Sequence, residues 1–331
     1  MLLRLFKNYR LSGMLFIIVL MIFPWLHAYL NPPPPNQLTG MPFYELLFNG
    51  LNRHPFSQAL MGMIFFGTLL IMITRFNVIH FMLEDRTYMP VFFYILITAS
   101  FPPVMQLSPI LVSTPFLLMA MLMLIRGDEH RANPLALFNA SLLLAAGSLF
   151  YLKIILFIPF LWITASVIRP LKWRGIVNPI LVVLMMVLFF VTYLWVFKED
   201  LTLFPELLQK NLSISSGEFQ GFDTPVLVLF SYLLFLLLVS GVHLMSRFKI
   251  RKIIIRKLYN VMFLLFIYCL LFYLFIAGYR AEIIFLLAIP MAYLFSNFFY
   301  RKRNHWIHEL MIWIWIGLLA WVYVEPSLNF G

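Results

Sequence analysis

The sequence has 331 residues, of which 63% are hydrophobic and 11% are charged. Water-soluble proteins have about 45–50% apolar and about 25% charged residues, so this composition excludes a soluble enzyme. The 36 Phe, 15 Tyr and 8 Trp exclude a disordered chain. The single cysteine, Cys269, excludes a disulfide framework and a thiolate metal cage. We therefore predict an all-α, polytopic transmembrane helical bundle.

The chain contains eleven apolar segments that approach the length of a membrane span, which is about 20 residues. The first follows Arg4, Lys7 and Arg10, as a signal peptide would. Its apolar run is long and no small-residue cleavage site follows it, so we expect an uncleaved anchor. The third and sixth segments are the shortest. In chain order the predicted spans are 12–30, 57–75, 88–101, 108–125, 133–151, 154–168, 175–197, 224–246, 258–277, 282–299 and 310–324.

The loop charges predict the orientation of these spans. With the N-terminus in the cytoplasm, 19 of the 24 Lys and Arg residues lie on the cytoplasmic side, which carries +14, and the outer side carries −3. This asymmetry is the positive-inside pattern, and an odd number of spans then places the C-terminus outside the cytoplasm. The net charge of +11 therefore indicates topology and contact with anionic lipids at the cytoplasmic face, with no support for nucleic-acid binding.

Two predicted outer loops, 31–56 and 198–223, are long enough to contain short interfacial helices. The first begins with four prolines, which form a stiff, extended spacer, and its residues 42–48 are predicted to be helical. The second places leucines among acidic residues, an amphipathic pattern typical of the membrane interface. The other connections are short, so we expect 1–331 to form a single transmembrane domain without a soluble domain.

Residues 87–115 are the most irregular apolar stretch. Prolines at 102, 103 and 109 interrupt it, and polar residues including Gln106 and Ser108 surround the break. Non-helical backbone at membrane depth requires protein or a wet cavity beside it. One interpretation is a pair of short re-entrant helices around an outward-facing pocket, as in transporters. The alternative is a tight hairpin between two tilted helices.

A group of ionisable side chains is predicted to converge on the outer face, which has few charges. Ionisable groups close to membrane depth are functional candidates, and a carboxylate beside several cations could provide a base and a phosphate site. The alternative is that Arg280 pairs with Glu282 at the headgroup level and that Lys153 extends to the interface. The group consists of His27, Glu45, Arg53, His54, Lys153, Arg280 and Glu282.

The inner face carries five histidines, but no metal site is predicted there. Each metal of a membrane di-iron centre takes several imidazole ligands, whereas only His305 and His308 share one side of a helix. Glycine-rich phosphate loops, nucleophile elbows and zinc-protease motifs are missing from the sequence. We therefore predict no cofactor.

Several short motifs are distributed over the chain: 84–90 (EDRTYMP), 99–102 (ASFP), 107–109 (LSP), 138–140 (FNA) and 147–151 (GSLFY). With the late Arg280 and Pro290, they resemble a family of uncharacterised polytopic proteins from Bacteroidota. This resemblance implies a bacterial inner membrane. Some members of that family carry a carotene-monooxygenase label, which the single histidine pair does not support.

The chain also resembles, more loosely, multi-span glycosyltransferases and polysaccharide polymerases that use polyprenyl-phosphate-linked sugars. Those enzymes have an acidic residue on the first outer loop and outer-face arginines that hold the lipid phosphate. The resemblance implies that Glu45 is the catalytic base and that Arg280, Lys153 and Arg53 bind phosphate. His54, Glu282, Gln106 and Ser108 are further polar site candidates.

Three functions follow as hypotheses, and the sequence leaves open whether the protein is an enzyme. The first is a transferase or polymerase that acts on lipid-linked sugars at the outer face. The second is a non-catalytic subunit of a secretion or envelope assembly, with other membrane proteins as partners. The third is a lipid or solute transporter built around the proline break.

Overall fold

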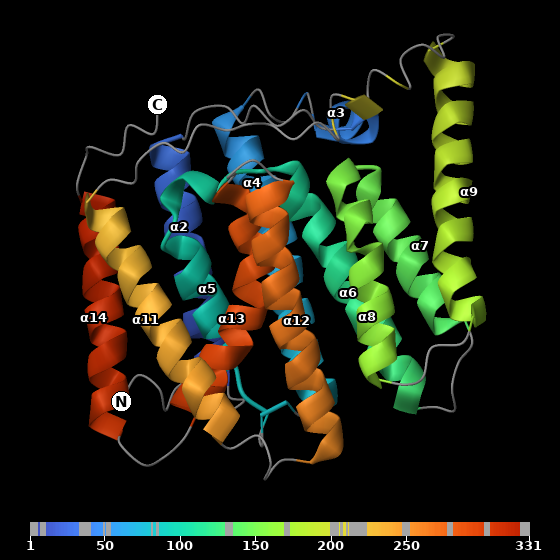
Figure 1. The fold of residues 1–331 in the computed structure, drawn as a ribbon. Coiled ribbons are helices and arrows are strands. Elements are labelled where there is room, and N and C mark those ends of the chain that lie inside the picture. Colours follow the sequence, from blue (N-terminus) through green and yellow to red (C-terminus); the bar gives the residue numbers. More distant parts are fainter. Residues whose placement is uncertain are drawn as a thin grey trace.

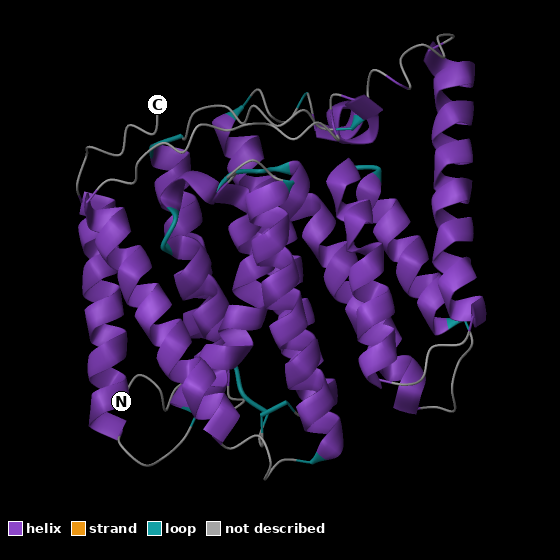
Figure 2. Ribbon diagram, in the orientation of Figure 1, coloured by secondary structure: helices purple, strands orange, loops and turns teal. Residues whose placement is uncertain are grey.

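The computed structural model of the protein describes residues 11–32, 41–48, 54–80, 82–83, 86–129, 135–168, 173–198, 224–246, 252–276, 281–300 and 305–324, with a few isolated positions such as Phe6. Within these residues all regular structure is helical and no strand occurs (Figure 2). The predicted all-α class is confirmed.

Each predicted span overlaps a helix, and predicted residues 42–48 coincide with a short helix, α3. In the part of the chain that the structure describes, seven helical segments are long and apolar enough to cross a membrane, so the chain is a multi-pass membrane protein. Between them lie shorter apolar helices. The elements are α2 (Leu11–Leu30), α3 (Pro42–Phe48), α4 (Pro55–His80), α5 (Met89–Ala99), η2 (Pro102–Val104), α6 (Pro109–Glu129), α7 (Ala136–Ser148), η3 (Leu152–Phe157), α8 (Ile158–Ile168), α9 (Trp173–Lys198), α11 (Thr224–Ser246), α12 (Ile253–Phe275), η5 (Ala281–Ile283), α13 (Ile284–Phe299) and α14 (His305–Val324).

The helices form an upright bundle, and α3 lies across its upper end (Figure 1). The loop charges predict that this end faces away from the cytoplasm, and we refer to it as the outer end. Of the second predicted interfacial segment, 198–223, most residues lie outside the described residues. The interfacial location of both segments stays a prediction.

The centre of the bundle is the pair α5 and α13, which pack closely together. Every residue of α5 is buried, and 78% of the α13 window is buried, against 22–39% for the other long helices. The ring of Phe93 on α5 lies 4.9 Å from that of Phe299 on α13 and 6.1 Å from that of Trp315 on α14. Such aromatic contacts stabilise the pair beyond the effect of buried area alone.

Buried hydroxyl groups in this central pair are hydrogen-bonded, as a medium of low polarity requires. The Tyr94 hydroxyl donates to the Phe285 carbonyl at 3.1 Å and the Tyr293 hydroxyl donates to the Ile73 carbonyl at 2.8 Å. Both bonds join helices that are far apart in sequence. They therefore fix how α4, α5 and α13 are rotated relative to one another.

The outer helices contact their neighbours over narrower faces. Helix α9 packs mainly on α7 and stands at the edge of the bundle (Figure 1). Its other faces expose apolar side chains such as Leu184 and Leu188, each 58% exposed. Helix α2 packs on α4 at Gly62, where a Cβ atom would lie 2.2 Å from the Trp25 ring. Only glycine therefore permits this close approach without movement of the indole.

Candidate functional site

At the outer end of the bundle, hydrogen bonds hold α3 above two connecting turns of the chain. The Tyr44 hydroxyl donates to the Leu107 carbonyl at 3.1 Å, and the Met41 amide donates to the Phe150 carbonyl at 3.4 Å. Tyr44 and Phe48 also form a buried cluster with Leu107. Helix α3 therefore covers the turn between α5 and α6 and the turn between α7 and η3.

The proline break is a compact, buried turn beneath α3. The amides of Val104 and Met105 donate to the carbonyls of Phe101 and Pro102, both at 3.1 Å, which closes the short 3-10 helix η2. The Ser108 hydroxyl accepts the amide of Leu111 at 3.2 Å, so Ser108 caps the start of α6. The hairpin and the re-entrant interpretations both stay predictions, because Phe101 of the same turn lines an apolar groove described below.

Gln106 has an unsatisfied atom within this turn. Its side-chain nitrogen donates to the Pro103 carbonyl at 3.3 Å, and the residue is 8% exposed. Its side-chain oxygen is buried and accepts no hydrogen bond from the part of the chain that the structure describes. A buried acceptor without a donor costs about 1–3 kcal/mol, so this atom is a natural acceptor for a hydroxyl group or a water molecule.

Lys153 has a structural partner at the outer end. Its ammonium group donates to the carbonyl of Ile276 at 3.0 Å, and Ile276 is the C-cap residue of α12. The last carbonyls of a helix lack intrahelical donors and carry partial negative charge. A lysine there satisfies one carbonyl and interacts favourably with the helix dipole.

The same arrangement is repeated at the other end of the same helix pair. The Lys257 ammonium, near the start of α12, donates to the carbonyl of Ile168, the last residue of α8. Lys153 lies in η3, directly before α8. Helices α8 and α12 pack together, so α8 receives a lysine cap from α12, and α12 receives one from η3, which leads into α8. We call this arrangement the reciprocal lysine caps.

The remaining predicted site residues are distributed over the same end. Glu45 is exposed on α3, and His54 is exposed at the start of α4, where its carbonyl accepts the amide of Gln58 at 3.1 Å. Glu282 is 9% exposed on η5, which packs against η2 and α6. Arg53 and Arg280 lie outside the described residues.

The structure thus brings the segments that carry Glu45, Gln106, Lys153 and Glu282 to one end of the bundle. The contacts that join them are Tyr44 with Leu107, Met41 with Phe150, η2 with η5, and Lys153 with the end of α12. Among the described residues, no three His, Cys, Asp or Glu side chains come together as a metal ligand set would.

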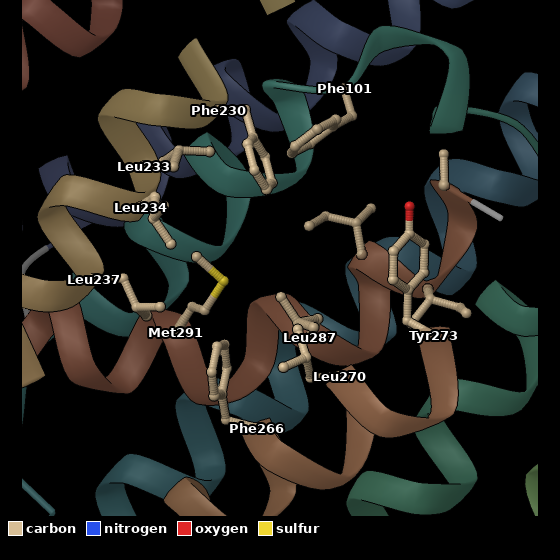
Figure 3. Close-up of a pocket in the computed structure, with 13 residues that line it drawn as sticks. Phe101, Phe230, Leu233, Leu234, Leu237, Phe266, Leu270, Tyr273, Leu287 and Met291 are labelled. Carbon is tan, nitrogen blue, oxygen red and sulfur yellow. The ribbon is translucent and has the colours of Figure 1, made fainter. Parts of the chain in front are cut away.

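Sequence reasoning did not find an apolar groove of about 300 Å³ beside this end (Figure 3). Helices α11 and α12 both pack on α13 but contact one another little, which leaves the space between them. The lining repeats at helical spacing, as at Phe230, Leu233, Leu234 and Leu237 on α11. These leucines resemble their lipid-facing neighbours in sequence, so no signal in the sequence distinguishes them.

A comparison with protein-family models matches residues 41–328 to a family of unknown function, DUF6427. The chain belongs to this family. The DUF6427 match begins at Met41 and therefore includes α3, the outer-end turns and all three groove helices. Comparisons with curated proteins and with solved structures give no match.

Proposed function

We propose that this protein is a transferase or polymerase that acts on a lipid-linked sugar at the outer face of a bacterial inner membrane. The observation that supports this proposal is the convergence of four polar segments at the outer end. They are α3 with Glu45, the turn with Gln106, η3 with Lys153 and η5 with Glu282. The orientation of the bundle, its location in a bacterial inner membrane and the class of substrate are all part of what we propose.

Glu45 is the proposed general base. It is exposed on a helix whose neighbour Tyr44 is hydrogen-bonded to the turn below, so the carboxylate is accessible while its backbone is fixed. In the proposed reaction it accepts the proton of an acceptor hydroxyl. That oxygen bonds to the anomeric carbon, and the bond from this carbon to the phosphate oxygen breaks.

The leaving group is a polyprenyl phosphate, which takes both electrons of the broken bond and gains negative charge. Cations close to that charge lower the energy of the transition state. The proposal assigns this role to Lys153, together with Arg53 and Arg280.

The test works without the identity of the sugar. Lipid extracts from a strain that lacks the gene are compared by mass spectrometry with extracts from strains that express wild-type protein or Glu45→Gln. We expect the polyprenyl-linked substrate to accumulate in the deletion strain and in the Glu45→Gln strain. Turnover should fall by about 10²-fold or more, as loss of a general base predicts.

Leu46→Ala is the matched control, since Leu46 is exposed on the same helix and carries no ionisable group. It should restore the wild-type lipid profile. If Glu45→Gln restores that profile equally well, the transferase proposal is wrong. Recovery of the protein with a stoichiometric membrane partner would then favour the subunit hypothesis.

A further inference from the structure

The groove between α11 and α12 has the shape of a site for one hydrocarbon chain. Its lining on α12 is Phe266, Leu270 and Tyr273, which face the lining residues of α11 across α13. Figure 3 shows side chains from all three helices directed into one space. Among the described lining residues, the Tyr273 hydroxyl is the one polar side-chain atom, so this lining suits apolar ligands.

The groove is open on the side that faces lipid. Its rim residues Phe230, Leu234 and Leu270 are 46%, 48% and 40% exposed, while Leu233 and Met291 at its base are 3% and 5% exposed. A soluble ligand would have to cross the hydrocarbon to reach such an opening. A membrane lipid, in contrast, can enter sideways.

The size of the groove suits one hydrocarbon chain. The lining on each wall extends over eight residues, from Phe230 to Leu237 and from Phe266 to Tyr273, or roughly 10 Å of helix rise. The groove has about 300 Å³, which accommodates one extended chain over that length.

The outer end of the groove lies beside a cation. Phe101 of the α5–α6 turn and Ala281 of η5 line that end. Along α12, Ile276 follows Tyr273 by three residues, and its carbonyl holds the Lys153 ammonium at 3.0 Å. A lipid whose chain fills the groove therefore has its headgroup at the end of the bundle that carries Lys153, whose positive charge attracts phosphate.

We propose that this groove binds the phosphate-proximal part of the chain of a polyprenyl phosphate lipid. The inference rests on the proposed function, and it names the lipid carrier and the place of its chain. A carrier with one chain fits a groove with room for one chain. A two-chain phospholipid would leave its second chain outside and gain less burial.

The test uses the full-length protein in phosphatidylcholine nanodiscs, with undecaprenyl phosphate as the probe and native mass spectrometry as the readout. Leu234→Trp adds bulk at the groove rim, and Leu238→Trp is the matched control. Leu238 lies one turn further along α11, is 62% exposed and does not line the groove. Leu270→Trp repeats the test from α12 in case Leu234→Trp folds poorly.

We expect Leu234→Trp and Leu270→Trp to weaken binding of undecaprenyl phosphate about tenfold, which corresponds to loss of roughly 50 Å² of apolar contact. Leu238→Trp should bind within about twofold of wild type. Equal binding by all three variants would overturn the inference. So would equal affinity for phosphatidylglycerol, or a dimer that Leu234→Trp dissociates, since these outcomes identify a bulk phospholipid or a second copy as the occupant.

This test separates the groove from the transferase. Glu45→Gln should bind the probe like wild type, because Glu45 does not line the groove. If Leu234→Trp loses binding but no substrate accumulates in the deletion strain, the groove binds the lipid and the transferase proposal is wrong. If the Leu234→Trp strain has a normal lipid profile, the inference about the groove is wrong and the transferase proposal is unaffected.

Discussion

The central pair α5 and α13 and the peripheral helix α9 differ in what surrounds them, although both are strongly apolar. α5 has 11 residues, all buried, whereas α9 has 26 residues and exposes most of its apolar side chains. Lipid tails are as apolar as leucine, so hydropathy does not distinguish a lipid-facing helix from a buried one. The difference lies in the contacts that hold each helix in place. Close packing against protein holds the central pair, whereas α9 is held mainly by a length sufficient to span the membrane.

The strongest test of this difference is the same substitution in both regions. Leu286 on α13 is 0% exposed and Leu188 on α9 is 58% exposed. We expect Leu286→Ala to lower the free energy of unfolding by about 2–5 kcal/mol because it leaves a cavity. Leu188→Ala should change it by less than about 0.5 kcal/mol, because lipid or detergent fills the space. Unfolding in detergent micelles measures both, and equal losses would contradict the distinction.

A smaller effect is expected where a peripheral helix packs closely on the bundle. Gly62→Ala places a methyl group against the Trp25 ring and should lower stability by about 1–3 kcal/mol through overpacking. The control Gly241→Ala on α11 meets no atom within 4 Å. It should be neutral or stabilising by up to about 1 kcal/mol. Thermal unfolding curves of the two variants should therefore shift in opposite directions, or only Gly62→Ala should shift.

The smallest effect is expected at the reciprocal lysine caps, which lie between the central pair and the periphery. Lys153→Met and Lys257→Met should each cost about 1–2 kcal/mol, because each removes a charged donor from a helix C-terminus. The two caps lie at opposite ends of α8, so the double variant should show additive losses within about 0.5 kcal/mol. The control Lys252→Met removes an exposed lysine at the start of α12 and should be close to neutral.

The sequence was most informative where hydropathy and local signals agree. Residues 42–48 are predicted and observed as a helix, and the span predicted at 224–246 coincides with α11. Prediction was weaker where packing decides. Residues 152–157 form a 3-10 helix before α8, and no local pattern separates that turn from the helix that follows.

The candidate site was predictable in its location and less so in its detail. The distribution of charged residues between the loops predicted that Lys153 and Glu282 share one face of the membrane, and their segments do lie at one end of the bundle. The partner of Lys153 is the carbonyl of Ile276, 123 residues away. Every residue has a backbone carbonyl, so the sequence cannot indicate which one accepts the bond, and only the folded chain reveals this contact.

The reciprocal lysine caps also bear on how a bound lipid would exchange. They connect α12 to η3 at one end and to α8 at the other, so this wall of the groove is held at both ends. The opposite wall, α11, packs on α13 and is joined to α14 through the Tyr232 hydroxyl, which donates to the Met311 carbonyl at 2.7 Å. Polar contacts outside the groove therefore hold both walls, so Tyr232→Phe should loosen one wall while it leaves every groove-lining side chain unchanged.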